Sequence, residues 1–145
     1  MSFALDLQKF AEKTGEKADA AIGNIVIRVA AELDRRSPVG DATYWKNPPP
    51  KGYIGGHFRG NWQLGVDSRP VAEIRRIDPT GEETQAAIRA EVPDEAAGRI
   101  YWLANNAPYA MRLEEGHSRQ APSGLVGLTA VMFQQIVRDA VEALP

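Results

Sequence analysis

The side chains of this chain that could support chemistry are two histidines, two adjacent glutamates and a serine. His57 and His117 are its 2 histidines, Glu114 and Glu115 lie just before His117, and Ser118 follows it. Two isolated histidines do not reproduce the spacing of a metal-ligand set. Neighbouring glutamates on a helix point in different directions and cannot flank one substrate bond, and no Gly-x-Ser-x-Gly turn surrounds the serine. We therefore predict no catalytic residue, no cofactor and no metal. One glutamate is interpreted as solvated and the other as a partner of an arginine.

The stretch Gly52 to Gly60 has the glycine content of a phosphate-binding loop. It lacks the Gly-Lys-Ser/Thr ending of such a loop and precedes an expected strand instead of a helix. We interpret it as the end of a flexible arm. The aromatic residues around this arm either anchor a partner surface or fold back on the domain core. They are Trp45, Tyr53, Phe58 and Trp62.

The composition is that of an ordinary globular domain. The chain has 145 residues, of which 43% are hydrophobic and 25% charged, so we expect a single domain. The absence of cysteine excludes a disulfide framework, a thiolate zinc site and a cysteine nucleophile. A net charge of −2 argues against a protein that grips nucleic acid along its phosphates. We expect no signal peptide, and no apolar run reaches the ~18 residues of a membrane span.

The hydrophobic pattern predicts helices at both ends of the chain. From Leu5 to Arg36, apolar residues recur three and four positions apart, which predicts one long helix with a bend near Gly15 and an end before Pro38. A short helix is expected at Tyr109–Glu115, ended by Gly116 in the C′ position. The last helix is expected from about Ser123, acting as its cap, to Leu144.

Between these helices the pattern predicts an arm and a sheet. Residues 37–60 are rich in turn formers and read as an extended arm. Alternation of apolar and polar residues predicts strands at 61–67, 71–77 and 85–92, and an aromatic strand at 99–105. The expected fold is α+β, with an antiparallel sheet of three to four strands and the short and C-terminal helices packed on one face. Its parts are the N-terminal helix 1–36, the arm 37–60, the β-sheet 61–105 and the helical C-terminal part 106–145.

Three fragments together resemble small proteins of tailed bacteriophages. Tyr109 to Gly124 contains Leu-Glu-Glu-Gly-His-Ser followed by Ala-Pro and a final helix, and it resembles a Tyr…Leu-Glu-x-Gly-x-Ser segment of the tail-completion or head–tail joining (neck) family. Ser37–Asp41 and His57–Trp62 are similar to two further segments of that family, which is close to the tail terminators. Here Gly40-Asp41 replaces a Thr-Gly pair, and a proline-rich insertion, Ala42 to Gly56, separates the two segments.

The resemblance implies a structural virion protein and not an enzyme. Such a protein is made in the host cytoplasm and acts in the neck or tail, with no membrane. It forms a homo-oligomeric ring, commonly a hexamer, that completes or caps the head-proximal end of the tail and joins it to the head connector. Its partners are neighbouring neck, connector and tail-tube proteins, and DNA passes through its channel without sequence-specific binding. The arm is expected to pack on an adjacent subunit or ring. The predicted interface residues are Trp45, Tyr53, Phe58, Arg59, Trp62, Glu114, Glu115, His117, Ser118 and Arg119.

Three alternatives stay open at this point. One is a tail terminator that stops growth of the tail tube. Another is a small α+β enzyme or ligand-binding domain with His57, His117 and Glu114 around a cleft. The last is a nucleic-acid-binding domain that uses the basic side chains Arg35, Arg36, Arg59 and Lys51.

Overall fold

A computed structural model describes residues 15–40, 48 and 51–144 of the chain. In these residues the fold is α+β. The elements in chain order are α2 (Glu16–Arg36), the 3-10 turn η2 (Arg59–Asn61), β1 (Trp62–Val66), α3 (Glu82–Glu91), β2 (Tyr101–Asn105), α4 (Ala110–Glu114) and α5 (Val126–Glu142). None of the helices in the described ranges is long and apolar enough to cross a membrane.

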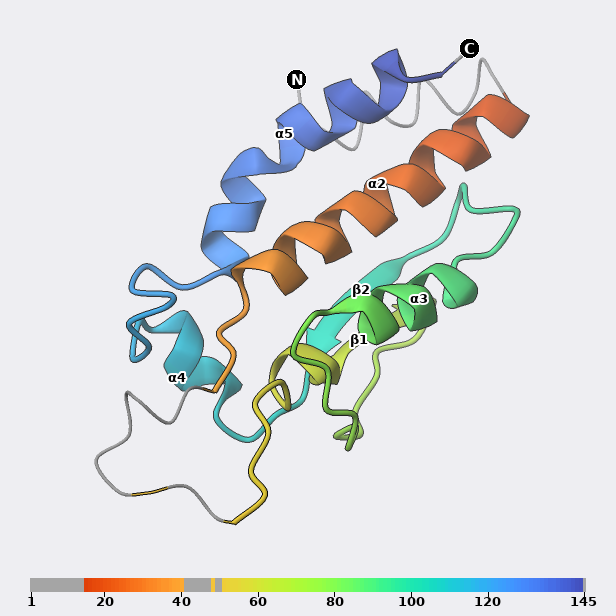
Figure 1. Cartoon of the computed structure of the whole chain (residues 1–145). Helices are drawn as coiled ribbons and strands as arrows, with labels where there is room; N and C mark the ends of the chain where they lie inside the picture. Colours follow the sequence, from red (N-terminus) through yellow and green to blue (C-terminus); the bar gives the residue numbers. More distant parts are fainter. Residues whose placement is uncertain (1–14, 41–47, 49–50, 145) are drawn as a thin grey trace.

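Helix α2 is the part of the predicted N-terminal helix that the structure describes, since residues 5–14 lie outside the described ranges. It begins after Gly15, whose φ of 50° is one that glycine adopts without strain. It ends at Arg36, as predicted from Pro38, because a residue before proline avoids the helical region. Figure 1 shows α5 running beside α2, with α2 between α5 and the part of the fold that holds α3 and the strands.

The sheet has two antiparallel strands in the described residues, so the prediction of three to four strands is wrong. β1 pairs with β2 in a register that places Trp62 opposite Asn105 and Val66 opposite Tyr101. Residues opposite each other in an antiparallel pair share a face, so Trp62 and Leu64 lie on one side with Leu103. This side carries the core, since Leu64 and Leu103 pack against the central cluster.

The predicted strand at 85–92 is instead most of helix α3. Alanine, glutamate, glutamine and arginine occupy 6 of the 8 positions of this segment, and their helix propensity outweighs a short alternation that fits either structure. The two buried residues of α3, Thr84 and Ile88, are four positions apart, which is a helical spacing. Asp78 stabilises the start of the helix, because its carboxylate accepts hydrogen bonds from the backbone N–H of Gly81 at 2.9 Å and of Thr84 at 2.7 Å.

The predicted strand at 71–77 forms no backbone ladder. Side chains hold this segment instead. Asn61 Oδ1 accepts a hydrogen bond from the Ile74 N–H at 2.8 Å, and the amide of Gln63 donates to the Ala72 carbonyl at 2.6 Å. The Asn106 amide donates to the same carbonyl at 3.1 Å. Side-chain partners therefore satisfy backbone groups that a third strand would have paired with the sheet.

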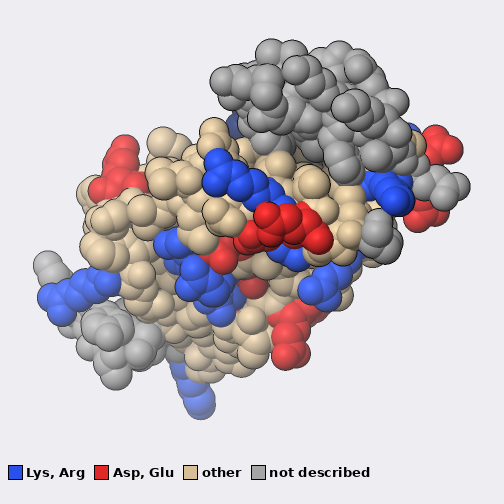
Figure 2. Space-filling view, turned by 90° about the horizontal axis from the view of Figure 1, so that it is seen from above, with Lys and Arg blue, Asp and Glu red and all other residues tan. Residues whose placement is uncertain are grey.

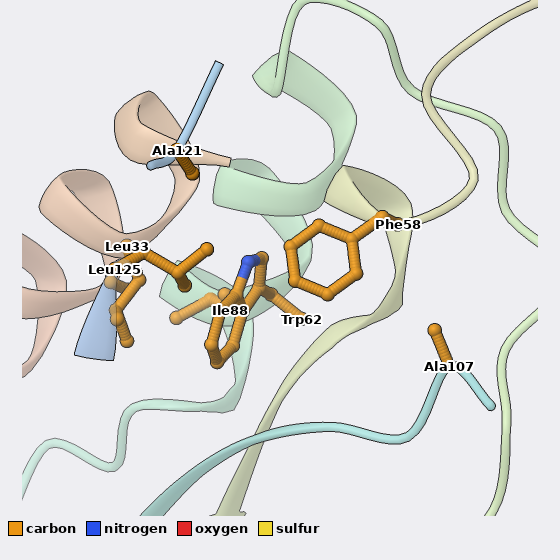
Figure 3. Packing of buried hydrophobic residues seen from close by; sticks show 8 residues of the cluster. Leu33, Phe58, Trp62, Ile88, Ala107, Ala121 and Leu125 are labelled. Atoms are coloured by element: carbon orange, nitrogen blue, oxygen red, sulfur yellow. The ribbon is translucent and has the colours of Figure 1, made fainter. Parts of the chain in front are cut away.

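The hydrophobic core forms around Trp62, which is 3% exposed. Figure 3 shows the indole between Phe58 on one side and Leu33 and Leu125 on the other, and the Phe58 and Trp62 rings meet edge to face at 6.0 Å. The buried cluster thus joins α2, β1 and the residue before α5. Its members are Ala30, Leu33, Phe58, Trp62, Ile88, Ala107, Ala121 and Leu125.

A buried carboxylate, Asp34, lies beside this core on α2. Its side chain is 8% exposed, and Oδ1 is 3.8 Å from Nε of Arg59. Burial raises the pKa of Asp34 to about 6; Arg59 lowers that pKa, and the nearby Asp78 carboxylate raises it. The folded protein therefore holds a proton on Asp34 at mildly acidic pH, where the unfolded chain has released it.

We predict that Asp34→Asn gains stability relative to the wild type as the pH rises. Folding raises the pKa of Asp34 from 3.8 to about 6. The contribution of Asp34 to the free energy of unfolding is therefore fully present below pH 3.8 and is lost as the pH rises through 6. The loss amounts to roughly 3 kcal/mol at most, from about 1.4 kcal/mol per pKa unit. Urea unfolding at pH 4.5 and 7.5 measures it. Asp94→Asn is the control, because the Asp94 carboxylate is exposed. If the stability difference between Asp34→Asn and the wild type were the same at both pH values, the raised pKa of Asp34 would be contradicted.

Candidate functional site

A groove of about 1310 Å³ opens on the surface where four separate segments meet. Its volume exceeds the ~300–1,000 Å³ that is usual for small-molecule pockets. The segments are residues 38–40 after α2, the stretch before η2, the extended residues after β1, and α4 with its following loop. The lining residues are Pro38, Val39, Gly40, Gly52, Tyr53, Ile54, Gly56, His57, Phe58, Glu73, Arg75, Ile77, Tyr109, Leu113, His117, Ser118, Arg119 and Gln120.

The side chain of Gln120 fixes one wall of the groove. Its amide donates to the Val39 carbonyl at 2.7 Å and accepts from the Val39 N–H at 2.9 Å, so it pairs with the backbone as a neighbouring strand would. Gly55 lies close against this wall, because a Cβ at that position would come within 2.3 Å of the Gly40 carbonyl oxygen. Only glycine permits this approach, which positions Tyr53 and Ile54 beside the wall.

Three side chains in contact with one another form another part of the lining. His57 Nδ1 lies 3.0 Å from the hydroxyl of Tyr109, and its Nε2 lies 3.1 Å from Oε1 of Glu73. The hydrogen bond between Nδ1 and the phenol runs in the direction that the tautomer of the ring sets, and Nε2 faces the carboxylate. Burial raises the pKa of Tyr109, and the nearby Tyr53 and Glu73 raise it further, so the phenol stays neutral. These contacts position the three side chains and do not activate any of them as a nucleophile.

The unpaired charges of the groove are positive. Glu73 is the one carboxylate among the described lining residues, and His57 contacts it. Arg75 and Arg119 are exposed, and neither forms an ion pair or a hydrogen bond in the described part of the chain. Exposed apolar side chains belong to the same lining. Ile54 is 61% exposed and Ile77 51%.

Glu114 does not line the groove, because it caps helix α5. Its Oε2 accepts hydrogen bonds from the backbone N–H of Leu125 at 3.0 Å and Val126 at 2.8 Å, and its Oε1 accepts from Gly127 at 3.0 Å. Burial raises the pKa of Glu114, but these hydrogen bonds together lower it below its usual range. The predicted Ser123 cap is therefore wrong. The interpretation that one glutamate pairs with an arginine is also wrong for the described residues, whereas exposed Glu115 agrees with the interpretation that the other is solvated.

The structure places the interface residues predicted from the sequence in different surroundings. Tyr53, Phe58, His117, Ser118 and Arg119 all line the groove. Phe58 and Trp62, however, are 5% and 3% exposed and fold back on the core, so Trp62 has no surface for a partner.

Two further candidates point elsewhere, and one lies outside the described residues. Arg59 turns inward and donates to the carbonyls of Pro79 and Ser37. Glu115 is exposed, and His117 Nε2 lies 3.8 Å from its Oε2. Trp45 lies outside the described ranges, as does most of the proline-rich arm. The described end of the arm packs on its own domain, with Gly56 against Asp78 and Pro79.

The residues of the enzyme alternative do not form one site in the described residues. Of the proposed enzyme residues, His57 and His117 line the groove but Glu114 does not. No group of three or more metal-ligating side chains occurs in the part of the chain that the structure describes. Figure 2 shows Lys and Arg interspersed with Asp and Glu on the face seen from the α5 side.

The proposed nucleic-acid-binding residues are also occupied within the chain. Arg35 and Arg36 both contact Glu32, at 2.8 and 3.4 Å. Arg59 is turned to the interior, which leaves exposed Lys51 as the remaining member of the set.

Sequence reasoning missed the groove residues Glu73, Arg75, Tyr109 and Gln120. A signal for two of them was present in the alternation at 71–77, since an extended segment places residues 73, 75 and 77 on one side. All three line the groove, although the segment is not a strand. Nothing local indicates that Gln120 would bind a backbone 81 residues away.

The chain matches no protein-family model, no curated protein and no solved structure.

We predict that Glu114→Ala destabilises the protein by about 1–2 kcal/mol, the usual cost of losing a helix cap. Glu115→Ala is the matched control, because that neighbouring side chain is 61% exposed, and it should leave stability unchanged. The contribution of Glu114 is present above pH 4.5, the pKa of a free glutamate, and is lost as the pH falls through its lower folded pKa. Denaturant unfolding of both variants at pH 7 and pH 3 measures this, and equal stabilities of the two variants at pH 7 would overturn the cap.

Proposed function

We propose that this chain is a structural protein of the neck or tail of a tailed bacteriophage. In this proposal it forms a ring that completes or caps the head-proximal end of the tail, joins the tail to the head connector and surrounds the DNA channel. The proposal starts from the resemblance of Ser37–Asp41, His57–Trp62 and Tyr109–Gly124 to the tail-completion and head–tail joining family.

The observation that carries the proposal is that these three segments converge on one face. The Trp62 indole donates to the Ser37 hydroxyl at 2.7 Å, which joins the first segment to the second. The hydrogen bond between His57 and Tyr109 joins the second to the third. Gln120 joins the third to the first through Val39. Segments that are far apart in the sequence thus form a single surface and line one groove.

The side chains at this junction are used to hold structure and leave a surface suited to binding. Glu114 caps α5, and Gln120 holds the backbone of residue 39. Exposed Ile54 and Ile77 together with unpaired arginines suit a contact with another protein. Ring closure requires one patch of each subunit to meet a different patch of the next, which such a one-sided surface allows.

A ligand-binding domain is the second candidate, because His57 and His117 line the same groove. This candidate shares the site with the first and differs in its consequences. A small-molecule function would leave virion assembly intact when the gene is lost.

The test is electron microscopy of particles from a host that carries a null allele of this gene, with heads and tails counted separately. We expect full heads beside unattached tails, and a plasmid copy of the wild-type gene should restore joined particles. Tails of excessive length would assign the protein as a tail terminator instead of a completion protein. Intact, infectious particles from the null allele would refute the neck function.

A further inference from the structure

The unpaired charge of the groove is opposite in sign to the net charge of the chain. The chain carries −2 overall, whereas the groove presents the free guanidinium groups of Arg75 and Arg119. They come from different segments, the extended residues after β1 and the loop before α5, and line one groove. Carboxylates are the natural partners of guanidinium groups, which bind them with paired hydrogen bonds.

The other residues that line the groove favour an occupant with apolar groups as well as negative charge. Ile54 and Ile77 are 61% and 51% exposed, and Tyr53 and Tyr109 are each 38% exposed. Exposed aliphatic and aromatic side chains in a groove gain free energy when apolar side chains of a partner cover them. The occupant should therefore carry carboxylates and apolar side chains together.

We propose that the groove binds an acidic peptide segment of a partner protein, in which Asp or Glu contacts Arg75 and Arg119 and apolar side chains cover Ile54 and Ile77. The assignment of this partner as a virion component rests on the proposed function. A nucleic acid fits less well, because the affinity of nucleic-acid binders comes mainly from neutralising many phosphates, and the groove presents two free arginines among its described lining residues.

The test begins with a random library of twelve-residue peptides selected against the full-length protein. We expect the enriched peptides to combine Asp or Glu with aromatic or aliphatic residues. The affinity of one enriched peptide is then measured by fluorescence anisotropy against the wild type and two charge-matched variants. Arg75→Glu/Arg119→Glu alters the groove, whereas Arg89→Glu/Arg138→Glu makes the same charge change at exposed positions on α3 and α5.

The groove variant should bind the peptide at least roughly tenfold more weakly, as expected for two exposed ion pairs, while the control variant binds like the wild type. Replacing the acidic residues of the peptide by Asn and Gln should cause a similar loss on the unaltered protein, a result that does not depend on the folding of any variant. Equal loss in both protein variants, or no enrichment of acidic peptides, would overturn the proposal.

A labelled single-stranded DNA of twelve nucleotides serves as the competing probe. If the wild type and the control variant bind this DNA and the groove variant does not, the groove is a nucleic-acid site and the peptide proposal is overturned. Peptide selection reports on the groove alone, and particle counts report on the role of the gene alone. Either proposal can therefore fail while the other stands.

Discussion

The hydroxyl of Ser37 is the point on which the arrangement of the domain depends. It donates to the Leu33 carbonyl at the end of α2 and accepts from the buried indole of Trp62, both at 2.7 Å. The carbonyl of the same residue accepts from Arg59 at 2.9 Å. One residue thus ends the long helix, fixes the central side chain of the core and positions the turn before β1. A buried indole N–H without this partner would carry the full cost of its desolvation.

The surface face follows from this junction. With Trp62 fixed, Phe58 packs against it and against Tyr109 at 6.1 Å, which places α4 next to the stretch before β1. Gln120 then closes the arrangement by binding Val39, just beyond Ser37. Carboxylates complete the frame, since Asp78 caps α3 and Glu114 caps α5 from outside each helix. The groove is therefore lined by segments whose backbones are held by side-chain hydrogen bonds, as a preformed binding surface requires.

Strong local signals predicted particular elements of this fold. Pro38 indicated the end of α2, and alternation around Trp62 and Leu103 indicated the two strands that pair. Gly116 ends α4 with a φ of 88°, as its position after the helix predicted. The strand predicted at 85–92 failed because short alternation does not distinguish a strand from a helix when the residues favour helix. The groove could be predicted only in part, since contacts such as Gln120 with Val39 depend on tertiary structure that no local pattern encodes.

The most direct test of the central junction is a double-mutant cycle between Ser37→Ala and Trp62→Phe, measured by denaturant unfolding. If the hydroxyl and the indole form this hydrogen bond, the stability losses of the two single variants should sum to more than the loss of the double variant. The difference should be about 0.5–3 kcal/mol. Ser123→Ala with Trp62→Phe is the control and should be additive, because Ser123 is exposed. Additive losses for Ser37 and Trp62 would show that the junction does not hold the three segments together and would contradict the account.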